Sequence, residues 1–415
     1  MTNLDAATAS WTAADLTAGM PATRTGTRPT GAGELFQLLR DGRPRTRADL
    51  ATATGQARST IAARVDQLLA SGLVSAAGEA SSTGGRPPAT FAFNPAARIV
   101  LAIDLGATHA TLAVTDLAAR VLAEHQEPIR IGDGPDVVLD LAATIGARLI
   151  TASGRSPDAL VGIGVGLPGP VEHETGRPVN PPIMPGWDGY DVPARLRSQF
   201  DVPVLVDNDV NLMALGEHEA VWPDTDNLLF VKIATGIGAG IISDGHLQRG
   251  AQGAAGDLGH IAVPGGPPVP CRCGNTGCLE AVASGQAIAA RLREQGIDVP
   301  TIVALTELAR TGNLPATRAL RQAGRETGAV LAACVSLLNP STIVIGGIVA
   351  DAGEHLLAGI REIVYQRSLP LATQHLRIVP SQTAGRAGII GASTMATQHA
   401  LSARAVDEAV GALLL

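Results

Sequence analysis

Apolar residues recur at helical spacing in three short runs near the start of the chain, between residues 35 and 69. The runs are separated by Asp41-Gly42 and by Gly55, and glycine is the residue that most often follows the end of a helix. A polar, glycine-rich loop comes next, and alternation over Ala89–Phe93 then predicts a strand. Three short helices and a hairpin in about 60 residues are typical of a winged helix-turn-helix, which we expect over residues 29–95.

From residue 96 onward the pattern changes to alternating strands and helices. The first of these elements are expected at Ile99–Ile103, Ala107–Thr115, Val137–Ala152 and Leu160–Gly166. A weak internal repeat relates Ile99–Val121 to Asn227–Leu247, since each has two strands around a glycine-bearing turn. Two similar α/β lobes, 96–222 and 223–415, with a cleft between them are therefore predicted. Residues 1–28 lack apolar periodicity, and we expect a flexible arm there.

The composition excludes a wholly disordered chain, because 46% of the residues are hydrophobic and only 17% are charged. No apolar run approaches the roughly 18 residues that a membrane helix needs, and residues 1–20 lack the features of a signal peptide. We therefore expect a cytoplasmic protein with no membrane partner. Lysine occurs once, at Lys232, and we attribute the preference for arginine to genome composition rather than to any site.

Charge is distributed unevenly along the chain. The formal net charge is −7, yet residues 21–98 hold ten arginines against five acidic residues. A small basic segment ahead of a large acidic body predicts a polyanion-binding module joined to a separate globular domain.

The second and third predicted helices carry the candidate DNA contacts. Thr46 and Asp49 resemble a capping box that opens helix Arg47–Thr54, and the third helix begins near Ala57. Side chains at the start of a recognition helix reach base edges in the major groove, and an arginine at a turn tip can follow phosphates or enter the minor groove. The predicted contacts to operator DNA are Arg47, Arg58, Ser59, Thr60, Arg64 and Arg86. The alternative is a small helical domain for protein contacts, with its arginines merely solvated.

A compact cysteine motif is the sharpest chemical signal. Cys271, Cys273 and Cys278 lie within eight residues, and His260 precedes the first of them by eleven. Three thiolates and one imidazole match the tetrahedral preference of Zn²⁺. Because they fill all four coordination positions, the zinc is expected to be structural. The alternative is an ordinary loop with three reduced cysteines.

Polar residues that suit a sugar follow the apolar run Val202–Val206. A carboxylate at the carboxyl end of a strand stands over the cleft of an α/β lobe, where it can accept a proton from a hydroxyl. Each sugar hydroxyl needs a donor and an acceptor, which Asn, Asp and His supply. The candidate sugar-binding residues are Asn180, Asn208, Asp209, Asp257 and His260. Taken singly, each could instead be a turn or cap residue.

Two glycine-bearing turns are candidate phosphate sites, since successive backbone N–H groups can bind anions. Their candidate residues are Gly106 and Thr108 in the first turn, and Thr235, Gly236 and Gly238 in the second. Glycines alone are weak evidence, and tight turns between buried strands are the alternative.

Together these motifs resemble the ROK family (repressors, open reading frames and sugar kinases), in the subgroup with an N-terminal winged helix. The resemblance runs from about Gly31 to the C-terminus. It rests on motifs in the family's order: the Asp104 turn, Gly166-Leu-Pro-Gly169, Pro185-Gly-Trp187, Asn208-Asp209, the second glycine-rich turn, Gly-Asp-Leu-Gly-His260, the cysteine motif, and Asn339-Pro340 before Ile345-Gly-Gly347. The family implies a two-lobed, actin-like (ribonuclease-H-like) ATPase fold, sugar binding between the lobes, a structural zinc, and a homodimer or homotetramer.

Carried onto this chain, the resemblance gives Asn208, Asp257 and His260 contacts to the sugar, and makes Asp209 the catalytic base in a kinase. It also implies that the cysteine motif and His260 hold zinc, so that the two ring nitrogens of His260 couple the zinc loop to the ligand. If ATP and Mg²⁺ binding were retained, Gly346 and Gly347 would hold the nucleotide together with the two phosphate turns.

Departures from the family pattern favour a regulator over a kinase. Family kinases usually read Asp-x-Gly-Gly-Thr-Lys at the first turn, where this chain has Ala107 and His109. Ile348 stands where a third glycine is expected, and Asp257 and Arg272 stand where kinases often have Glu. Phosphoryl transfer depends on positioning, so several displaced parts multiply their losses, whereas sugar binding survives such changes more easily.

We therefore expect a sugar-responsive transcriptional regulator, specifically a repressor of carbohydrate uptake or catabolism genes, with operator DNA and a sugar or sugar phosphate as partners. An ATP-dependent sugar kinase of the hexokinase type with a DNA-binding appendage is one alternative, because Asp209 is retained. A regulator controlled by a protein partner is the other.

Overall fold

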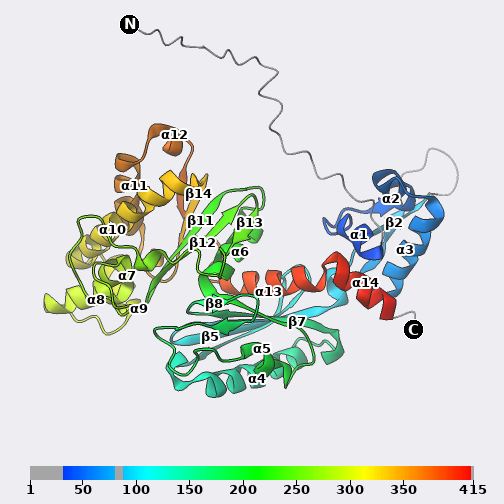
Figure 1. The fold of residues 1–415 in the computed structure, drawn as a ribbon, viewed down its shortest axis with the longest axis horizontal. Coiled ribbons are helices and arrows are strands. Elements are labelled where there is room, and N and C mark those ends of the chain that lie inside the picture. Colours follow the sequence, from blue (N-terminus) through cyan, green and yellow to red (C-terminus); the bar gives the residue numbers. More distant parts are fainter. Residues whose placement is uncertain (1–30, 80–86, 413–415) are drawn as a thin grey trace, which may run out of the picture. The chain divides into compact units, whose positions relative to one another are not determined.

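The computed structural model describes residues 31–79 and 87–412, which divide into two compact units (Figure 1). The first comprises the described residues up to Asn94 together with helix α14, and the second runs from Pro95 to Leu401. The predicted arm, residues 1–28, and the predicted DNA contact Arg86 lie outside the described residues.

The first unit confirms the winged helix-turn-helix plan. Its elements are α1 (Ala32–Gln37), α2 (Arg47–Thr54), α3 (Arg58–Ala70) and an antiparallel sheet in the order β1 (Arg45–Thr46), β3 (Ala89–Phe93), β2 (Val74–Glu79). The predicted capping box is present, since Thr46 Oγ1 accepts from Asp49 N at 3.1 Å and the Asp49 carboxylate accepts from Thr46 N at 2.8 Å. Gly55 follows α2 with a φ of 67°, which glycine adopts without steric cost.

Helix α14 (Ala403–Ala412) packs against α1 within the first unit. Asp407 Oδ1 accepts a hydrogen bond from Gly33 N at 2.8 Å, and a Cβ at Gly33 would overlap the carbonyl oxygen of Ala403. The two helices therefore meet backbone to backbone. Sequence order alone groups these residues with the larger domain, 96–415, because nothing in it separates them.

The first lobe of the second unit is built on a five-stranded sheet. Its order is β10 (Val204–Asn208), β7 (Leu160–Leu167), β4 (Ile99–Leu105), β5 (His109–Asp116), β6 (Val121–Pro128). One face packs against α4 (Pro135–Ala152) and α5 (Val192–Arg197), and the other against α6 (Asp209–Val221) and α13 (Ala387–Ala400). The fully buried Trp187 belongs to the core beside α4, where its Nε1 donates to Ile131 O at 3.0 Å.

The second lobe repeats the same strand plan, which confirms the internal repeat. Its sheet has the order β13 (His246–Gln248), β12 (Ile237–Ser243), β11 (Leu228–Ile233), β14 (Thr342–Gly346), β15 (Arg377–Pro380). In both lobes an antiparallel three-stranded meander is extended by two parallel strands. One face packs against α6, and the other against helices α7 (Leu279–Ala283), α8 (Gly285–Glu294), α9 (Ile302–Arg310), α10 (Leu314–Leu338) and α11 (Glu354–Arg367).

Short elements complete the second unit. They are β8 (Val171–Glu172), β9 (Arg177–Pro178), α12 (Pro370–Thr373) and the 3₁₀ turns η1 (Pro95–Ala97), η2 (Ile131–Asp133), η3 (Pro157–Ala159), η4 (Leu258–His260) and η5 (Ala350–Ala352). Two α/β lobes of this kind form the sugar-kinase/actin fold that the family resemblance implies. Within residues 31–79 and 87–412, no helix combines the length and apolar character needed to cross a membrane.

Candidate functional site

The acidic run after β10 lies where the strand turns directly into α6. Asn208 is the N-cap of that helix, and its Oδ1 accepts from the backbone N–H groups of Val210 (2.9 Å) and Asn211 (3.3 Å). Its Nδ2 donates to Gly169 O at 3.0 Å, in the loop after β7. This strand-to-helix switch sets three consecutive polar side chains at the carboxyl edge of the first sheet, the usual place for a ligand in an α/β fold.

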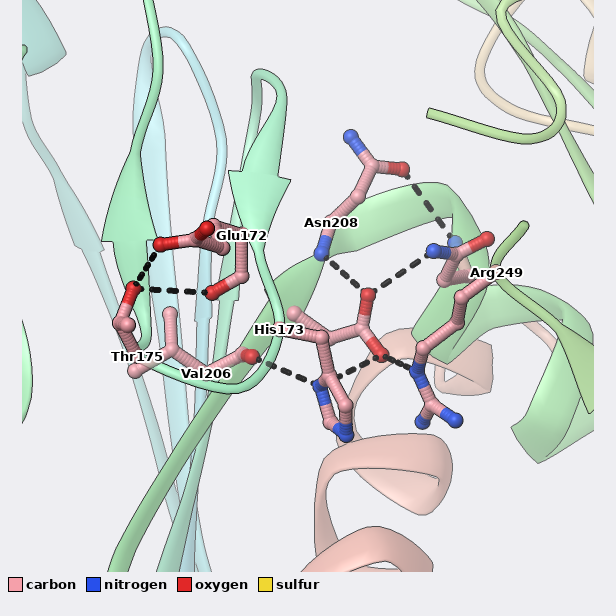
Figure 2. A network of polar contacts seen from close by, with 8 residues as sticks. Glu172, His173, Thr175, Val206, Asn208 and Arg249 are labelled. Atoms are coloured by element: carbon pink, nitrogen blue, oxygen red, sulfur yellow. Dashed lines mark hydrogen bonds and ion pairs between the residues drawn. The ribbon is translucent and has the colours of Figure 1, made fainter. Parts of the chain in front are cut away.

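Asp207, which the sequence analysis did not select, is the centre of a buried polar network. Its side chain is 2% exposed, and Oδ1 accepts from Asn208 N and Asn211 Nδ2, both at 2.8 Å. Oδ2 accepts from Arg249 Nε at 2.6 Å and lies 3.5 Å from His173 Nδ1. Figure 2 shows His173, Asn208 and Arg249 converging on this carboxyl group. Because Arg249 follows β13, the ion pair joins the two lobes.

Asp209 forms a second ion pair between the lobes. Its side chain is 4% exposed, and Oδ2 accepts from Lys232 Nζ at 2.5 Å, from the middle of the second sheet. Asp104, at the end of β4, is the other carboxyl group here: a Cβ at Gly166 would lie 3.3 Å from Asp104 Oδ1 and 3.5 Å from Asp209 Cα. Loss of hydration, together with the charge of Asp209, raises the pKa of Asp104 to about 6, while Lys232 opposes the shift.

The two glycine-bearing turns are present, but side chains lie against both. In the first, Gly106 N donates to His109 O at 2.8 Å, and the His109 ring lies so close that a Cβ at Gly106 would overlap it. Thr108 is exposed in the same turn. In the second, Ile237 N donates to Glu280 Oε2 at 3.1 Å, and that carboxylate would overlap a Cβ at Gly236.

The remaining turn residues occupy related positions around the second sheet. Thr235 is half-buried in the turn itself, and Gly238 pairs with Lys232 across strands β11 and β12. Gly346 pairs with Lys232 on the other side, and Gly347 follows with a φ of 84°. Two of the predicted phosphate residues of the second lobe, Gly238 and Gly346, therefore flank one lysine.

The predicted sugar ligands fall into two groups. Asn180 is exposed with a φ of 44°, and its N–H donates to Asp188 Oδ1 at 2.7 Å. Pro181, the next residue, lies over Gly169, whose carbonyl binds Asn208, so Asn180 and Asn208 share one neighbourhood. Asp257 and His260 form the other group, with Asp257 Oδ1 3.9 Å from His260 Nε2. The loop that begins at Arg249, the partner of Asp207, leads into this second group.

The cysteine motif closes into a cluster with the dimensions of a zinc site. The ligand atoms of His260, Cys271, Cys273 and Cys278 all lie within 4.8 Å of one another. Cys273 Sγ is 3.7 Å from Cys278 Sγ, and Cys271 Sγ is 3.6 Å from His260 Nδ1. Tetrahedral zinc with its usual bond lengths requires about 3.8 Å between two sulfurs and about 3.6 Å between sulfur and nitrogen. The donor set and its spacing therefore fit Zn²⁺.

The ring of His260 is oriented for two tasks, because Nδ1 faces the cysteines while Nε2 faces Asp257. Burial raises the pKa of Cys278 to about 12, whereas a hydrogen bond from the backbone of Asn275 lowers that of Cys273 to about 7. Binding zinc as thiolates therefore releases protons, including that of the buried Cys278.

The predicted DNA contacts on α2 and α3 differ in their exposure and in their contacts within the unit. Arg58 and Ser59 are exposed in the first turn of α3, while Thr60 and Arg64 are half-buried, with Arg64 hydrogen-bonded to Gln56. Arg47 is committed within the unit: its Nη2 binds Asp66 Oδ1 at 2.5 Å, and its guanidinium lies 4.7 Å from the centre of the Phe91 ring.

A family model of ROK proteins matches residues 100–399, which include both lobes, the Asp207–Asp209 run and the cysteine motif. This chain belongs to the ROK family. The assignment confirms the resemblance found in the sequence.

The chain is similar to ROK regulators over most of its length. It is 30% identical to the xylose repressor of Caldicellulosiruptor bescii, covering 83% of this chain and 90% of that protein. The crystal structure of a ROK family transcriptional regulator, a homologue of the E. coli MLC protein, matches with a TM-score of 0.78 at 28% identity, covering 91% of this chain and 98% of that one. A ROK glucokinase from Streptomyces griseus, solved with glucose and AMPPNP, matches with a TM-score of 0.62 at 28% identity, covering 72% of this chain and 99% of the kinase. Similarity to the regulator thus extends further along this chain.

Sequence reasoning missed the cations of this ROK site. Lys232 and Arg249 lie 23 and 42 residues from the aspartates they bind, and nothing in the local sequence indicates those pairings. The one available signal was that Lys232 is the single lysine in the chain. Genome composition explains that rarity in the sequence alone, whereas the position of Lys232 beside Asp209 calls for a structural explanation.

Proposed function

We propose that this protein is a sugar-responsive, DNA-binding transcriptional repressor of carbohydrate uptake or catabolism genes. The observation that carries the proposal is the union, in one chain, of a recognition helix that presents Arg58 and Ser59 to solvent with a ROK sugar-kinase-like unit. The relatives named as repressors support it, and the effector class is a sugar or sugar phosphate. Two chains, or four, would present paired recognition helices to half-sites about one helical turn apart.

In this proposal the sugar binds where the lobes meet. Asn180, Asn208 and Asp257 supply donors and acceptors for hydroxyl groups, and His260 adds Nε2. Zinc, when bound by His260 and the three cysteines, would fix the orientation of that ring as a structural ion. A sugar that contacts both lobes favours one lobe arrangement over another, which is the differential binding that a switch requires.

The chain path offers a connection from this site to the DNA-binding unit. A Cβ at Gly388, in the first turn of α13, would overlap the carboxylate of Asp104, so α13 begins at the acidic cluster. Helix α13 ends at Ala400, and after Leu401-Ser402 the chain enters α14 of the first unit. A shift of α13 that accompanies lobe closure would therefore act on a helix of the DNA-binding unit.

A thermal-shift screen of sugars, sugar phosphates and nucleotides, followed by DNA-binding titrations with each hit, tests the proposal. We expect a sugar or sugar phosphate to raise the melting temperature and to change operator affinity. Asp257→Ala should weaken binding of that ligand and leave DNA binding without ligand intact. The control is Asp298→Ala, which removes an exposed acid elsewhere in the second lobe and should change neither ligand binding nor DNA binding. A protein that binds its operator but responds to no sugar would instead be controlled by a protein partner.

A sugar kinase is the second candidate, because Asp209 stands at the start of α6 where a catalytic base is expected. An assay of ADP release with aldohexoses, ATP and Mg²⁺ separates the two functions. Turnover near 1–10³ s⁻¹ that is lost in Asp209→Asn would establish the kinase. We expect no such turnover, because Lys232 holds the Asp209 carboxylate.

A further inference from the structure

Lys232 lies on the face of the second sheet that packs against α6. Strand residues alternate between faces, which places it with Leu228 and Phe230, both part of the apolar cluster beneath that helix. Its cross-strand neighbours are glycines on both sides, Gly238 on β12 and Gly346 on β14. A Cβ at Gly346 would overlap the ring of Phe230, and one at Gly238 would lie 3.0 Å from Val210, so the two glycines leave space for these apolar side chains beside Lys232.

The ammonium group ends at the Asp209 carboxylate, and its charge also acts on the nearby Asp104. It binds Asp209 at 2.5 Å, and the lysine side chain is 21% exposed. Burial alone would lower the pKa of Lys232, but the charges of Asp209 and Asp104 raise it above its ordinary value, so the ammonium is charged at neutral pH. In the rest of the chain every basic residue other than histidine is an arginine. A compact ammonium, unlike a planar guanidinium, acts as a point charge.

Two carboxylates beside turns that are candidates for binding phosphate are the kind of ligand set with which phosphoryl-transfer sites hold Mg²⁺. We propose that Lys232 is a tethered counter-cation: its ammonium takes the place of that metal ion, compensates the carboxylates of Asp104 and Asp209, and prevents the site from assembling for phosphoryl transfer. The inference rests on the proposed function, since it explains how a kinase-like site binds a sugar without turnover.

The replacement has two chemical consequences. An ammonium carries one charge and has no coordination positions for phosphate oxygens, so it cannot clamp a nucleotide as Mg²⁺ does. It also occupies Asp209 Oδ2, the kind of atom to which a reacting sugar hydroxyl would pass its proton. An ammonium has three N–H donors, so one bond to Asp209 leaves two for sugar hydroxyl oxygens. Lys232 is therefore a positioning residue that favours binding over chemistry.

A single lysine permits a direct test in the wild-type protein. Labelling with ¹⁵N-lysine gives one side-chain ammonium resonance, provided that the expression tag lacks lysine. We expect a slowly exchanging, hydrogen-bonded ammonium signal that disappears in Asp209→Asn and persists in Asp224→Asn, which removes an exposed acid from the loop before β11. A fast-exchanging signal like that of free lysine, unchanged by Asp209→Asn, would overturn the proposal.

Metal binding provides the second test, with the zinc site kept loaded. In Mn²⁺ titrations followed by electron paramagnetic resonance, we expect Lys232→Met to bind one ion per chain at least tenfold more tightly than the wild type. The gain should be absent in Lys232→Arg, which keeps the charge, and in the double variant Lys232→Met/Asp209→Asn. Mn²⁺ affinity that is equal in the wild type and in a folded Lys232→Met contradicts the counter-cation role.

ADP release from the same proteins separates this inference from the proposed function. Turnover by the wild type that is abolished in Lys232→Met would overturn both, because Lys232 would then be a ligand of the transferred phosphate. An inactive wild type with a solvent-like lysine signal would overturn the counter-cation alone and leave the repressor in place.

Discussion

The start of the recognition helix and the acidic run after β10 differ in how their charged side chains are neutralised. At the start of the recognition helix, Arg58 is exposed and makes no ion pair within the described residues. At the carboxyl edge of the first sheet, Asp207 and Asp209 are almost fully buried, and each binds a cation from the other lobe. The first surface keeps its charge available for an external polyanion, whereas the second site neutralises its charges within the chain.

This difference follows from the partners proposed for each unit. DNA phosphates bring their own negative charge, and their neutralisation by arginine releases counterions. A sugar brings hydroxyl groups instead, so a buried carboxylate at its site needs a cation from the protein itself. Because those cations come from the second lobe, the ion pairs also join the two lobes.

The strongest test lies at the cysteine cluster, where the chain provides thiol groups but no cation. Removal of zinc by a chelator should lower the free energy of unfolding of the second unit by an amount of the order of several kcal/mol, since metal binding is coupled to folding. Urea titrations followed by the fluorescence of Trp187 and Trp222, which lie in that unit, measure the loss. Cys334→Ser, outside the cluster, is the control. Unchanged unfolding after a metal-sensitive dye confirms complete extraction would contradict a structural zinc.

The next largest effect is expected at Arg249. Its replacement by Met leaves Asp207 buried without its cation, which should cost about 3–5 kcal/mol. Replacing Asp207 by Asn in the same protein should recover part of the loss, and a double-mutant cycle measures the coupling. The matched control is Arg386→Met, which breaks the more exposed pair with Glu124 and should cost about 1 kcal/mol or less. Equal losses for the two arginines would remove the distinction between a buried and an exposed pair.

The ease of predicting these features from sequence depended on how far apart the interacting residues are. Thr46, Asp49 and Gly55 act within one helix, and the predicted bounds of α2 are those observed. The cysteine motif could be predicted equally well, because three of its four candidate ligands lie within eight residues. The strand plan followed from the repeated hairpins, with strand ends displaced by one or two residues.

Long-range pairings could not be read in the same way. Glu217 in α6 is fully buried and accepts hydrogen bonds from Ser381 and Thr383, more than 160 residues away, at the point where the chain returns to the first lobe. Lys232 and α14 posed the same problem, because their partners are brought close only by the finished fold. Residue types and spacing select the candidate residues, whereas their charge compensation depends on tertiary structure.

The pH dependence of stability should have opposite signs in the two units. The pKa of Asp104 is raised to about 6, so its favourable contribution is fully present below pH 3.8 and is lost as pH rises through 6. The side chain of Asp104→Asn stays neutral. Between pH 4 and pH 7.5, the free energy of unfolding of this variant should therefore rise by up to about 3 kcal/mol relative to that of the wild type. Tryptophan fluorescence during urea unfolding at the two pH values measures this gain.

Asp41 in the first unit provides the contrast. A hydrogen bond from Arg45 lowers its pKa to about 2, so its contribution is present above pH 3.8 and is lost as pH falls through 2. Asp41→Asn should therefore destabilise the first unit at pH 7, by an amount that solvent screening keeps small. Hydrogen exchange of α1 and α3 reports on that unit separately. If Asp104→Asn and Asp41→Asn both raised stability at neutral pH, the two carboxyl groups would not differ in the sign of their contribution.

The smallest effect on stability is expected at Arg58, which makes no ion pair within the described residues. Arg58→Ala should weaken operator binding by about 1–3 kcal/mol if the guanidinium reads a base, and should reduce the salt slope by about 1 if it contacts a phosphate. Arg318→Ala removes an equally exposed arginine from α10 and should leave DNA binding unchanged. Arg47→Ala should act differently, since it breaks the contacts with Asp66 and Phe91 and therefore lowers the stability of the first unit. Fluorescence anisotropy at several salt concentrations separates the two modes, and operator affinity that Arg58→Ala leaves intact would mean that the exposed charge of α3 serves another partner.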